Sequence, residues 1–279
     1  MAVIQWYPGH MNKARNQIED KLSLIDVVIE VLDARIPLAS RNPLIQKLVG
    51  QKPHLIILNK ADLADPVVTR QWQEALAGEN HLVVSLDSLH HTNMNGLLNS
   101  IKRSASVRIK KLKAKGAVNP TIRTAIVGVP NCGKSTLINR LVGHHAAEVG
   151  NKPGVTKGQK WLKTQTNIQI LDTPGILWPK FTDETVGYKL AALGAIKDSI
   201  FHSDDVALYV LVALKRDYRA NLRQFARVSA AEFEQLSNPD LLLAMTKKYG
   251  MQDDYDRFSL YFLQRLRKGK LGRISLDRP

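Results

Sequence analysis

The chain has 279 residues, of which 40 are Lys or Arg and 25 are Asp or Glu, so its formal net charge is +15. This length predicts two domains, and the single cysteine, Cys132, excludes an intramolecular disulfide and a cysteine-based zinc site. The positive charge favours a partner made of phosphates, and the lack of cysteine pairs favours a reducing, cytoplasmic location. The longest apolar run, residues 206–214, is too short to span a membrane, so no membrane partner is expected.

The first 180 residues alternate between helices and short apolar strands. Ala14, Ile18 and Leu22 recur with helical spacing, and a second helix is expected at residues 66–77. Strands are expected at residues 26–32, 54–58, 81–85, 124–129, 160–164 and 168–171. Strands that alternate with helices predict an α/β domain whose sheet is mostly parallel and is covered by helices on both faces.

After about residue 180 the expected strands stop and only helical patterns remain. A capping-box motif that starts at Ser229 predicts one helix, and Phe258 and Phe262 belong to the apolar stripe of another. We therefore expect two domains, residues 1–180 with the sheet and residues 181–279 built from helices alone.

The most specific motif is G-x-x-x-x-G-K-S at residues 128–135 (GVPNCGKS), between an apolar strand and a helix. Its glycines let backbone N–H groups surround phosphate oxygens, and the helix N-terminus adds partial positive charge. Lys134 is expected to reach the β- and γ-phosphates, and Ser135 to offer its hydroxyl to Mg²⁺. The nucleotide contacts expected from this P-loop are Asn131, Cys132, Gly133, Lys134, Ser135 and Thr136.

A second motif, DTPG at residues 172–175, follows another apolar strand. Asp172, at the strand end, can hold the hydration shell of Mg²⁺, and the backbone N–H of Gly175 can sense a γ-phosphate. The motif alone could be an ordinary turn. Its distance from the P-loop favours a switch element.

The motif NKAD at residues 59–62 has the pattern that binds guanine in GTPases. Asp62 can accept hydrogen bonds from both N1–H and the exocyclic amine of guanine, and adenine lacks that arrangement. Lys60 is expected to lay its stem over the base, Asn59 to bond the base edge and neighbouring loops, and Ala61 to line the same loop. Together with the other two motifs, NKAD predicts GTP or GDP and not ATP.

The order of these motifs differs from that of ordinary GTPases, in which the base-binding motif follows the phosphate-binding motifs. Here it precedes both. The same sheet can form if the usual chain ends are joined and the chain is opened elsewhere, and we interpret residues 102–123 as the join. The next strand end supplies Asp87 and Ser88 as a second base-contacting loop, although its sequence departs from the usual Ser-Ala-Lys.

These features resemble the circularly permuted GTPases, specifically the ribosome biogenesis GTPase A (YlqF-like) family. Besides the three motifs above, the resemblance rests on WYPGHM at residues 6–11, DAR at 33–35, PGVT at 153–156 and ILWP at 176–179, and it covers the whole chain. It implies a Mg²⁺-dependent GTP hydrolase that binds a late precursor of the large ribosomal subunit and its rRNA. It also implies that the particle stimulates a slow intrinsic rate and that hydrolysis releases the factor. We expect a monomer.

The resemblance assigns roles to further residues. Thr156 matches the switch threonine that binds Mg²⁺ and the γ-phosphate, and a surface threonine is the alternative. Asn131 is associated in related proteins with a potassium ion, or it simply forms the turn. Ile176 stands where other GTPases carry a water-orienting glutamine, and an apolar side chain cannot do that work. His10 is the candidate catalytic residue in its place, and a packing or RNA-contacting histidine is the alternative.

Two other side-chain groups have a structural and a functional interpretation. Asp33 and Arg35 are interpreted as an ion pair beside a local loop, where exposed pairs contribute little, rather than as a contact to the particle. Cys132 is interpreted as a small P-loop residue rather than a redox sensor.

The basic C-terminal tract, residues 257–279, holds seven basic residues and one acidic residue. Its apolar stripe should pack inward and leave several cations free for phosphates, with a merely solvated face as the alternative. The expected RNA contacts are Arg265, Arg267, Lys268 and Lys270. The competing function is an RNA-binding assembly placeholder that uses GTP as a structural ligand. A membrane-associated trafficking GTPase is disfavoured because the chain has no lipidation motif.

Overall fold

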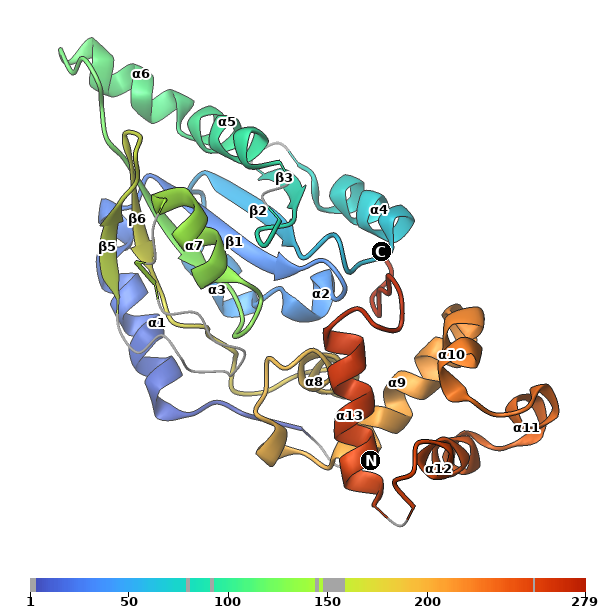
Figure 1. The fold of residues 1–279 in the computed structure, drawn as a ribbon. Helices are drawn as coiled ribbons and strands as arrows, with labels where there is room; N and C mark the ends of the chain where they lie inside the picture. Colours follow the sequence, from blue (N-terminus) through green and yellow to red (C-terminus); the bar gives the residue numbers. More distant parts are fainter. Residues whose placement is uncertain (1–3, 79–80, 91–92, 144–145, 148–158, 253) are drawn as a thin grey trace.

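A six-stranded sheet forms the centre of the protein, in the order β3-β2-β1-β4-β6-β5 (Figure 1). The computed structural model describes residues 4–78, 81–90, 93–143, 146–147, 159–252 and 254–279. The strands are β1 (Val27–Asp33), β2 (His54–Asn59), β3 (His81–Leu86), β4 (Ile122–Val127), β5 (Lys160–Lys163) and β6 (Ile168–Asp172). Five strands run parallel, and β5 pairs antiparallel with β6. The predicted α/β fold with a mostly parallel sheet is confirmed.

The strand ends differ slightly from their predicted positions, for local reasons. The strand predicted at 124–129 begins at Ile122, which pairs with Ile168, and ends before Gly128. Gly128 has φ +152° and begins the P-loop. The β5–β6 pair is antiparallel because residues 164–167 are too few for a parallel crossover connection.

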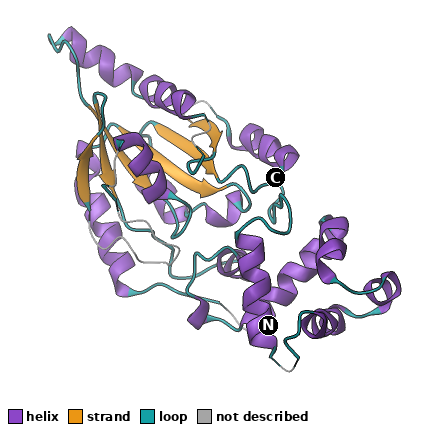
Figure 2. Ribbon diagram, viewed as in Figure 1, coloured by secondary structure: helices purple, strands orange, loops and turns teal. Residues whose placement is uncertain are grey.

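Helices cover both faces of the sheet (Figure 2). They are α1 (Gly9–Lys21), α2 (Pro37–Ser40), α3 (Pro43–Val49), α4 (Pro66–Leu76), α5 (Met94–Ser104), α6 (Ser106–Ala114) and α7 (Lys134–Val142), with a 3₁₀ turn, η1 (Leu22–Leu24), after α1. Alternate residues of a strand face opposite sides. Accordingly, Leu32 and Leu58 pack against Trp72 of α4, whereas Val31 and Ile57 belong to the main core cluster.

The C-terminal part of the chain is built from helices, as predicted. They are α8 (Glu184–Ala192), η2 (Asp198–Ile200), α9 (Ser203–Asp217), α10 (Arg219–Ala226), α11 (Ala230–Gln235), α12 (Asn238–Lys248) and α13 (Tyr255–Arg267). The capping box of Ser229 and Glu232 is formed at the start of α11. Phe258 and Phe262 are buried on α13, and Gly269, with φ +68°, follows the end of that helix.

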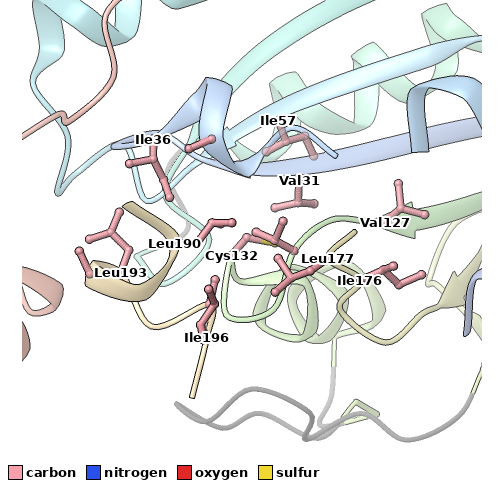
Figure 3. Packing of buried hydrophobic residues seen from close by; sticks show 14 of the residues in the cluster. Val31, Ile36, Ile57, Val127, Cys132, Ile176, Leu177, Leu190, Leu193 and Ile196 are labelled. Atoms are coloured by element: carbon pink, nitrogen blue, oxygen red, sulfur yellow. The ribbon is translucent and has the colours of Figure 1, made fainter. Parts of the chain in front are cut away.

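One hydrophobic cluster continues from the sheet into these helices. Ile176, Leu177, Leu190 and Ile196 pack with Val31 of β1 (Figure 3). The side chains that link the two predicted domains are therefore buried together, and the two regions share a core.

The last residues of the chain return to the sheet, and the C-terminus lies near α4 (Figure 1). The backbone N–H of Ile274 donates to Leu63 O at 3.0 Å, and that of Leu276 donates to Arg35 O at 2.7 Å. The Asp277 carboxylate accepts from the N–H of Ala39 at 2.8 Å. The tail thus fastens the helical region to the loops that follow β1 and β2.

Candidate functional site

The predicted nucleotide-binding residues gather at the carboxyl ends of the parallel strands. From β1 the chain proceeds to β2 and β3 on one side, and from β4 it proceeds to β6 on the other. The P-loop follows β4, so it lies where the chain direction across the sheet reverses, which is the usual ligand position in open α/β sheets. NKAD, here called the base loop (residues 59–62), begins at the end of β2.

The P-loop requires glycine at two positions. A Cβ at Gly128 would approach Val31 O to 2.3 Å, and a Cβ at Gly133 would approach Asn59 Nδ2 to 2.2 Å. Gly133 has φ +100°, and α7 starts at Lys134 immediately after it. The loop therefore leads directly into a helix N-terminus, where backbone N–H groups favour a phosphate.

The lysine of the P-loop is folded over its own loop. Lys134 is buried, and its Nζ donates to Gly128 O at 3.1 Å and to Val129 O at 2.8 Å. The two carbonyls hold the ammonium against the P-loop itself. Ser135 and Thr136 belong to the first turn of α7.

Asp172 fits the predicted role beside a cation. It ends β6 and is only 5% exposed, and its Oδ1 has no hydrogen-bond partner among the described residues. Burial raises the pKa of Asp172 to about 6, against the lowering effect of the Lys134 ammonium. An unpartnered buried carboxylate needs a donor or a cation, and Mg²⁺ prefers oxygen ligands. Thr156, the third predicted ligand, lies outside the described residues.

The residues that follow Asp172 lie against the P-loop. A Cβ at Gly175 would approach the backbone of Pro130 to 2.6 Å, and the N–H of Ile176 donates to Gly128 O at 3.2 Å. Asn42 Nδ2 donates to Ile176 O at 2.9 Å. Ile176 itself is buried in the core (Figure 3), so its side chain offers nothing to an attacking water.

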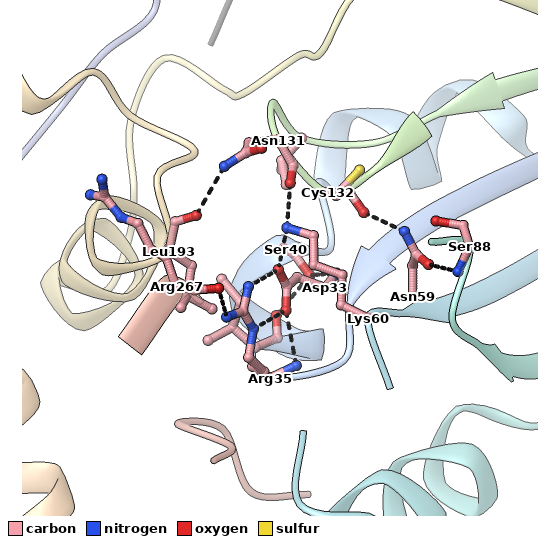
Figure 4. A network of polar contacts seen from close by, with 12 residues as sticks. Asp33, Arg35, Ser40, Asn59, Lys60, Ser88, Asn131, Cys132, Leu193 and Arg267 are labelled. Atoms are coloured by element: carbon pink, nitrogen blue, oxygen red, sulfur yellow. Dashed lines mark hydrogen bonds and ion pairs between the residues drawn. The ribbon is translucent and has the colours of Figure 1, made fainter. Parts of the chain in front are cut away.

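The base loop is joined to both neighbouring loops through Asn59. Its Nδ2 donates to Cys132 O at 2.8 Å, and its Oδ1 accepts from the N–H of Ser88 at 3.2 Å (Figure 4). Lys60 has φ +60°, and its Nζ donates to Asn131 O at 2.5 Å. The P-loop, the base loop and the loop after β3 therefore form one connected rim.

Asp62 is half-buried and lies beside a second acid. Oxygens of Asp62 and Asp87 and a ring nitrogen of His90 lie within 4.8 Å of one another. Burial raises the pKa of Asp62, and the negative charge of Asp87 raises it further. Asp87 is itself paired with His90 and accepts from the N–H of Leu89 at 2.8 Å. The structure thus places Asp87 and Ser88 next to the base loop.

The Asp33–Arg35 pair is buried, contrary to the expectation of an exposed ion pair. Arg35 Nε and Nη2 each donate to Asp33 at 2.8 Å, and Lys60 Nζ lies 3.0 Å from Asp33 Oδ2 (Figure 4). Arg35 Nη1 also donates to Arg267 O at 3.2 Å, at the end of α13. Burial alone would raise the pKa of Asp33, but Arg35 and Lys60 hold it well below its usual range.

The candidate catalytic residue, His10, is adjacent in sequence to a residue that contacts the segment after Gly175. His10 is exposed in the first turn of α1, with its ring 6.5 Å from that of Trp6. Its neighbour Met11 is buried, and Met11 Sδ accepts from the N–H of Leu177 at 3.4 Å. Met11 and Asn42 were not predicted as site residues, because sequence spacing gives no signal for contacts between distant segments.

Two other residues are clarified by their contacts. Cys132 is buried, and burial raises the pKa of its thiol, which supports the interpretation as a packing residue (Figure 3). Asn131 has φ +59°, which suits a turn-forming residue, and its Nδ2 donates to Leu193 O at 3.4 Å, at the end of α8.

The expectation that Arg267 is free for RNA is wrong. It forms a two-point ion pair with Asp198 at 2.7 and 3.1 Å and donates to Ala191 O and Ala192 O, each at 2.9 Å. Lys268 and Lys270 are exposed, and Arg265 is half-buried. Among the described residues, no helix is both long and apolar enough to cross a membrane.

Comparison with known proteins agrees with this geometry. A family described as 50S ribosome-binding GTPase matches residues 123–247. The chain is 44% identical to Ribosome biogenesis GTPase A of Bacillus cereus, over 99% of this chain and 94% of that one. It is 33% identical to mitochondrial ribosome-associated GTPase 1 of Mus musculus, over 99% of this chain and 90% of that one.

Solved structures give the same result. A GDP-bound YlqF matches with a TM-score of 0.67 and 27% identity, over 94% of this chain and 99% of that one. A GNP-bound YlqF from T. maritima matches with a TM-score of 0.66 and 28% identity, over 96% and 98% of the two chains. Relatives match nearly the whole chain, and the base loop precedes the P-loop around one shared sheet. The chain therefore belongs to the ribosome biogenesis GTPase A family of circularly permuted GTPases, and it is a GTP hydrolase.

Proposed function

We propose that this chain binds a late precursor of the large ribosomal subunit and its rRNA, hydrolyses GTP in response to that particle, and leaves it in the GDP state. The names of its relatives, which include a ribosome biogenesis factor and a ribosome-associated GTPase, support a ribosomal partner. The proposal places the protein in the cytoplasm as a monomer, with residues 1–180 as the GTPase domain and residues 181–279 as the RNA-binding domain.

One observation carries the proposal: the residues after Gly175 share a core with the helical region. Ile176 and Leu177 pack with Leu190 of α8. A γ-phosphate that draws the Gly175 N–H toward itself must move these two side chains, and close-packed interiors transmit such displacements. The state of the nucleotide can therefore change how α8, and the helices packed on it, are presented to a partner.

We assign the nucleotide contacts by position in the rim. Asp62 receives the two guanine donors, Lys60 covers the base, and Asp87 and Ser88 flank it. Lys134 and the P-loop N–H groups hold the phosphates, with the side chains of Ser135 and Asp172 directed to Mg²⁺. When bound, Mg²⁺ supplies neutralisation of the charge that develops on the phosphates. Thr156 completes the set in the GTP state, and K⁺ beside Asn131 is part of the proposal.

Hydrolysis requires a water that attacks the γ-phosphorus while GDP leaves, and it yields inorganic phosphate. Ile176 cannot orient that water. We assign this function to His10, because its neighbour Met11 already contacts Leu177 and an exposed side chain there can turn toward the phosphates when the particle binds. Intrinsic turnover is accordingly slow, and the particle accelerates it.

Phosphate release, measured with and without purified large-subunit precursor, tests the proposal. We expect the particle to raise the rate several-fold or more, and His10→Ala to lower the stimulated rate by about 10²-fold, the range of a lost general base. GDP affinity should be unchanged. His202→Ala, which removes another exposed histidine, is the matched control. Binding of the particle without any acceleration would favour the placeholder function, and full activity of His10→Ala would refute the assignment of His10.

A further inference from the structure

A strongly basic surface lies away from both the nucleotide site and the C-terminal tract. It consists of residues 102–115, the end of α5 and all of α6, here called the basic arm. All seven of its cationic side chains are exposed: Lys102, Arg103, Arg108, Lys110, Lys111, Lys113 and Lys115. The chain has no acidic residue anywhere from residue 88 to residue 147.

The basic arm contributes almost nothing to the core. No residue of α6 is buried, and Val107 is 63% exposed. Figure 1 shows α6 extending beyond the edge of the sheet, at the end of the molecule opposite the C-terminal helices. Arg108 anchors the arm through Asp26, whose other oxygen accepts from the N–H of Arg123. Within the described part of the chain, the other six cations have no acidic partner within 4.0 Å.

The cations of the basic arm are so closely spaced that their positive electrostatic potentials reinforce one another. Lys111 and Lys115 are one helical turn apart, about 6 Å along the axis, and this is less than the Debye length of about 8 Å at physiological salt. Like charges at this spacing destabilise a helix. A helix whose only role is solubility mixes both signs. In this chain the cations of the projecting helix α6 repel one another, and among the described residues an acidic side chain pairs only with Arg108. This repulsion indicates a polyanionic partner.

We propose that the basic arm docks on the sugar–phosphate backbone of folded RNA, as a second contact surface distant from the α13 tract. The proposal rests on the proposed ribosomal partner for the source of that RNA. Folded RNA fits better than an anionic membrane, because α6 has no aromatic residue and Val107 is the one large apolar side chain that it exposes strongly. Helices that lie in a membrane surface present a broad apolar face.

The basic arm is also separate from the nucleotide site. Its anchor, Asp26, immediately precedes β1, at the amino end of the parallel strands, whereas the P-loop and the base loop follow the carboxyl ends. Removing the arm's charges should therefore change RNA binding and leave guanine-nucleotide binding intact.

The test compares two variants of the full chain that lose the same charge. The arm variant is Lys110→Gln, Lys111→Gln, Lys113→Gln and Lys115→Gln, which keeps Arg108 and residues of good helix propensity. The control variant is Lys13→Gln, Lys47→Gln, Arg70→Gln and Lys163→Gln, all exposed and outside both the arm and the proposed RNA-binding domain. Fluorescence anisotropy with a labelled 20-base-pair RNA duplex gives Kd from 50 to 300 mM KCl. GDP affinity and circular dichroism report on the site and the fold.

The arm variant should bind the duplex at least about tenfold more weakly at about 100 mM KCl. Its log Kd–log[salt] slope should fall by up to about 3.6, since each of the four lost phosphate contacts removes about 0.9. The control slope should change by less than about 1. Equal effects of the two variants, or a wild-type slope in the arm variant, would overturn the proposal. So would loss of binding to phosphatidylserine vesicles with RNA binding unchanged.

The same proteins separate this inference from the proposed function. Duplex binding that depends on the arm, without any stimulation of hydrolysis by the large-subunit precursor, would refute the proposed function and uphold the arm. Stimulated hydrolysis with an arm variant that binds RNA as tightly as wild type would uphold the proposed function and refute the arm.

Discussion

Asp33→Asn tests whether the buried carboxylate organises the site. The substitution keeps the side-chain size and removes the charge that holds two cations. Arg35 is only 2% exposed, and its two 2.8 Å hydrogen bonds to Asp33 would no longer be made to a negative charge. Lys60 Nζ, 3.0 Å from Asp33 Oδ2, would likewise lose its anionic partner. Breaking a buried ion pair by neutralising one member leaves an uncompensated charge, at a cost of about 3–5 kcal/mol.

We expect the free energy of unfolding to fall by about 3–5 kcal/mol, measured by urea titration with an unchanged m-value. GDP affinity should also fall, because Lys60 retains only Asn131 O to hold it across the base position. Asp217→Asn is the matched control. It breaks the bidentate pair with Arg216, whose side chain is 69% exposed, and should cost less than about 1 kcal/mol.

The pH dependence of the free energy of unfolding provides a second test of the Asp33 carboxylate. Because the folded-state pKa of Asp33 is depressed, its stabilisation is complete above the unfolded-state pKa of about 3.9 and is lost only as the pH falls through the lower folded value. The difference between wild type and Asp33→Asn should therefore be the same at pH 7 and pH 5. Two results would show that the Asp33 carboxylate does not stabilise the fold through Arg35 and Lys60. One is a decrease in the free energy of unfolding of less than about 1 kcal/mol in Asp33→Asn, and the other is a difference from wild type that vanishes by pH 5.

Two further predictions follow from titratable groups of the site. Guanine binding needs ionised Asp62, and burial and the charge of Asp87 raise the pKa of Asp62, so GDP affinity should decline on acidification. Asp87→Asn should lower the pKa of Asp62 and move this decline to lower pH, as measured by calorimetry at several pH values. A shift to higher pH would contradict the assigned role of Asp87. Cys132 is buried with a raised thiol pKa, so the folded protein should react with a thiol reagent at pH 8 much more slowly than the urea-unfolded protein, and equal rates would show that the P-loop opens freely.

The sheet and the loops around its carboxyl edge could be predicted because their signals are local. Strand patterns of four to seven residues marked all six strands, and motifs at the ends of several of them identified the loops. The order of the motifs indicated only that the usual sheet can form from a permuted chain, and the strand order itself comes from the structure. The antiparallel direction of β5 was not predicted, although residues 164–167 are too few for a parallel crossover to β6.

The polar links between the sheet and the helical region could not be predicted. Asp33 and Arg35 look like a surface pair in the sequence, and their burial depends on Leu266 and Arg267, more than 230 residues away. Arg267 likewise resembles a free cation until Asp198 is placed beside it. Periodicity and spacing describe one element at a time, so a side chain whose partner belongs to a distant helix carries no such signal.

We propose that the rim formed by the P-loop, the base loop and the loop after β3 selects guanine through Asp62. Affinities of wild type and Asp62→Asn for GTP and xanthosine triphosphate test it most directly, with Asp217→Asn as the control. We expect Asp62→Asn to lose at least about 100-fold in GTP affinity, because the amide cannot accept from both guanine donors, and to gain affinity for xanthosine triphosphate. A variant that still binds GTP as tightly as wild type, with no gain for the xanthine nucleotide, would show that Asp62 does not select guanine.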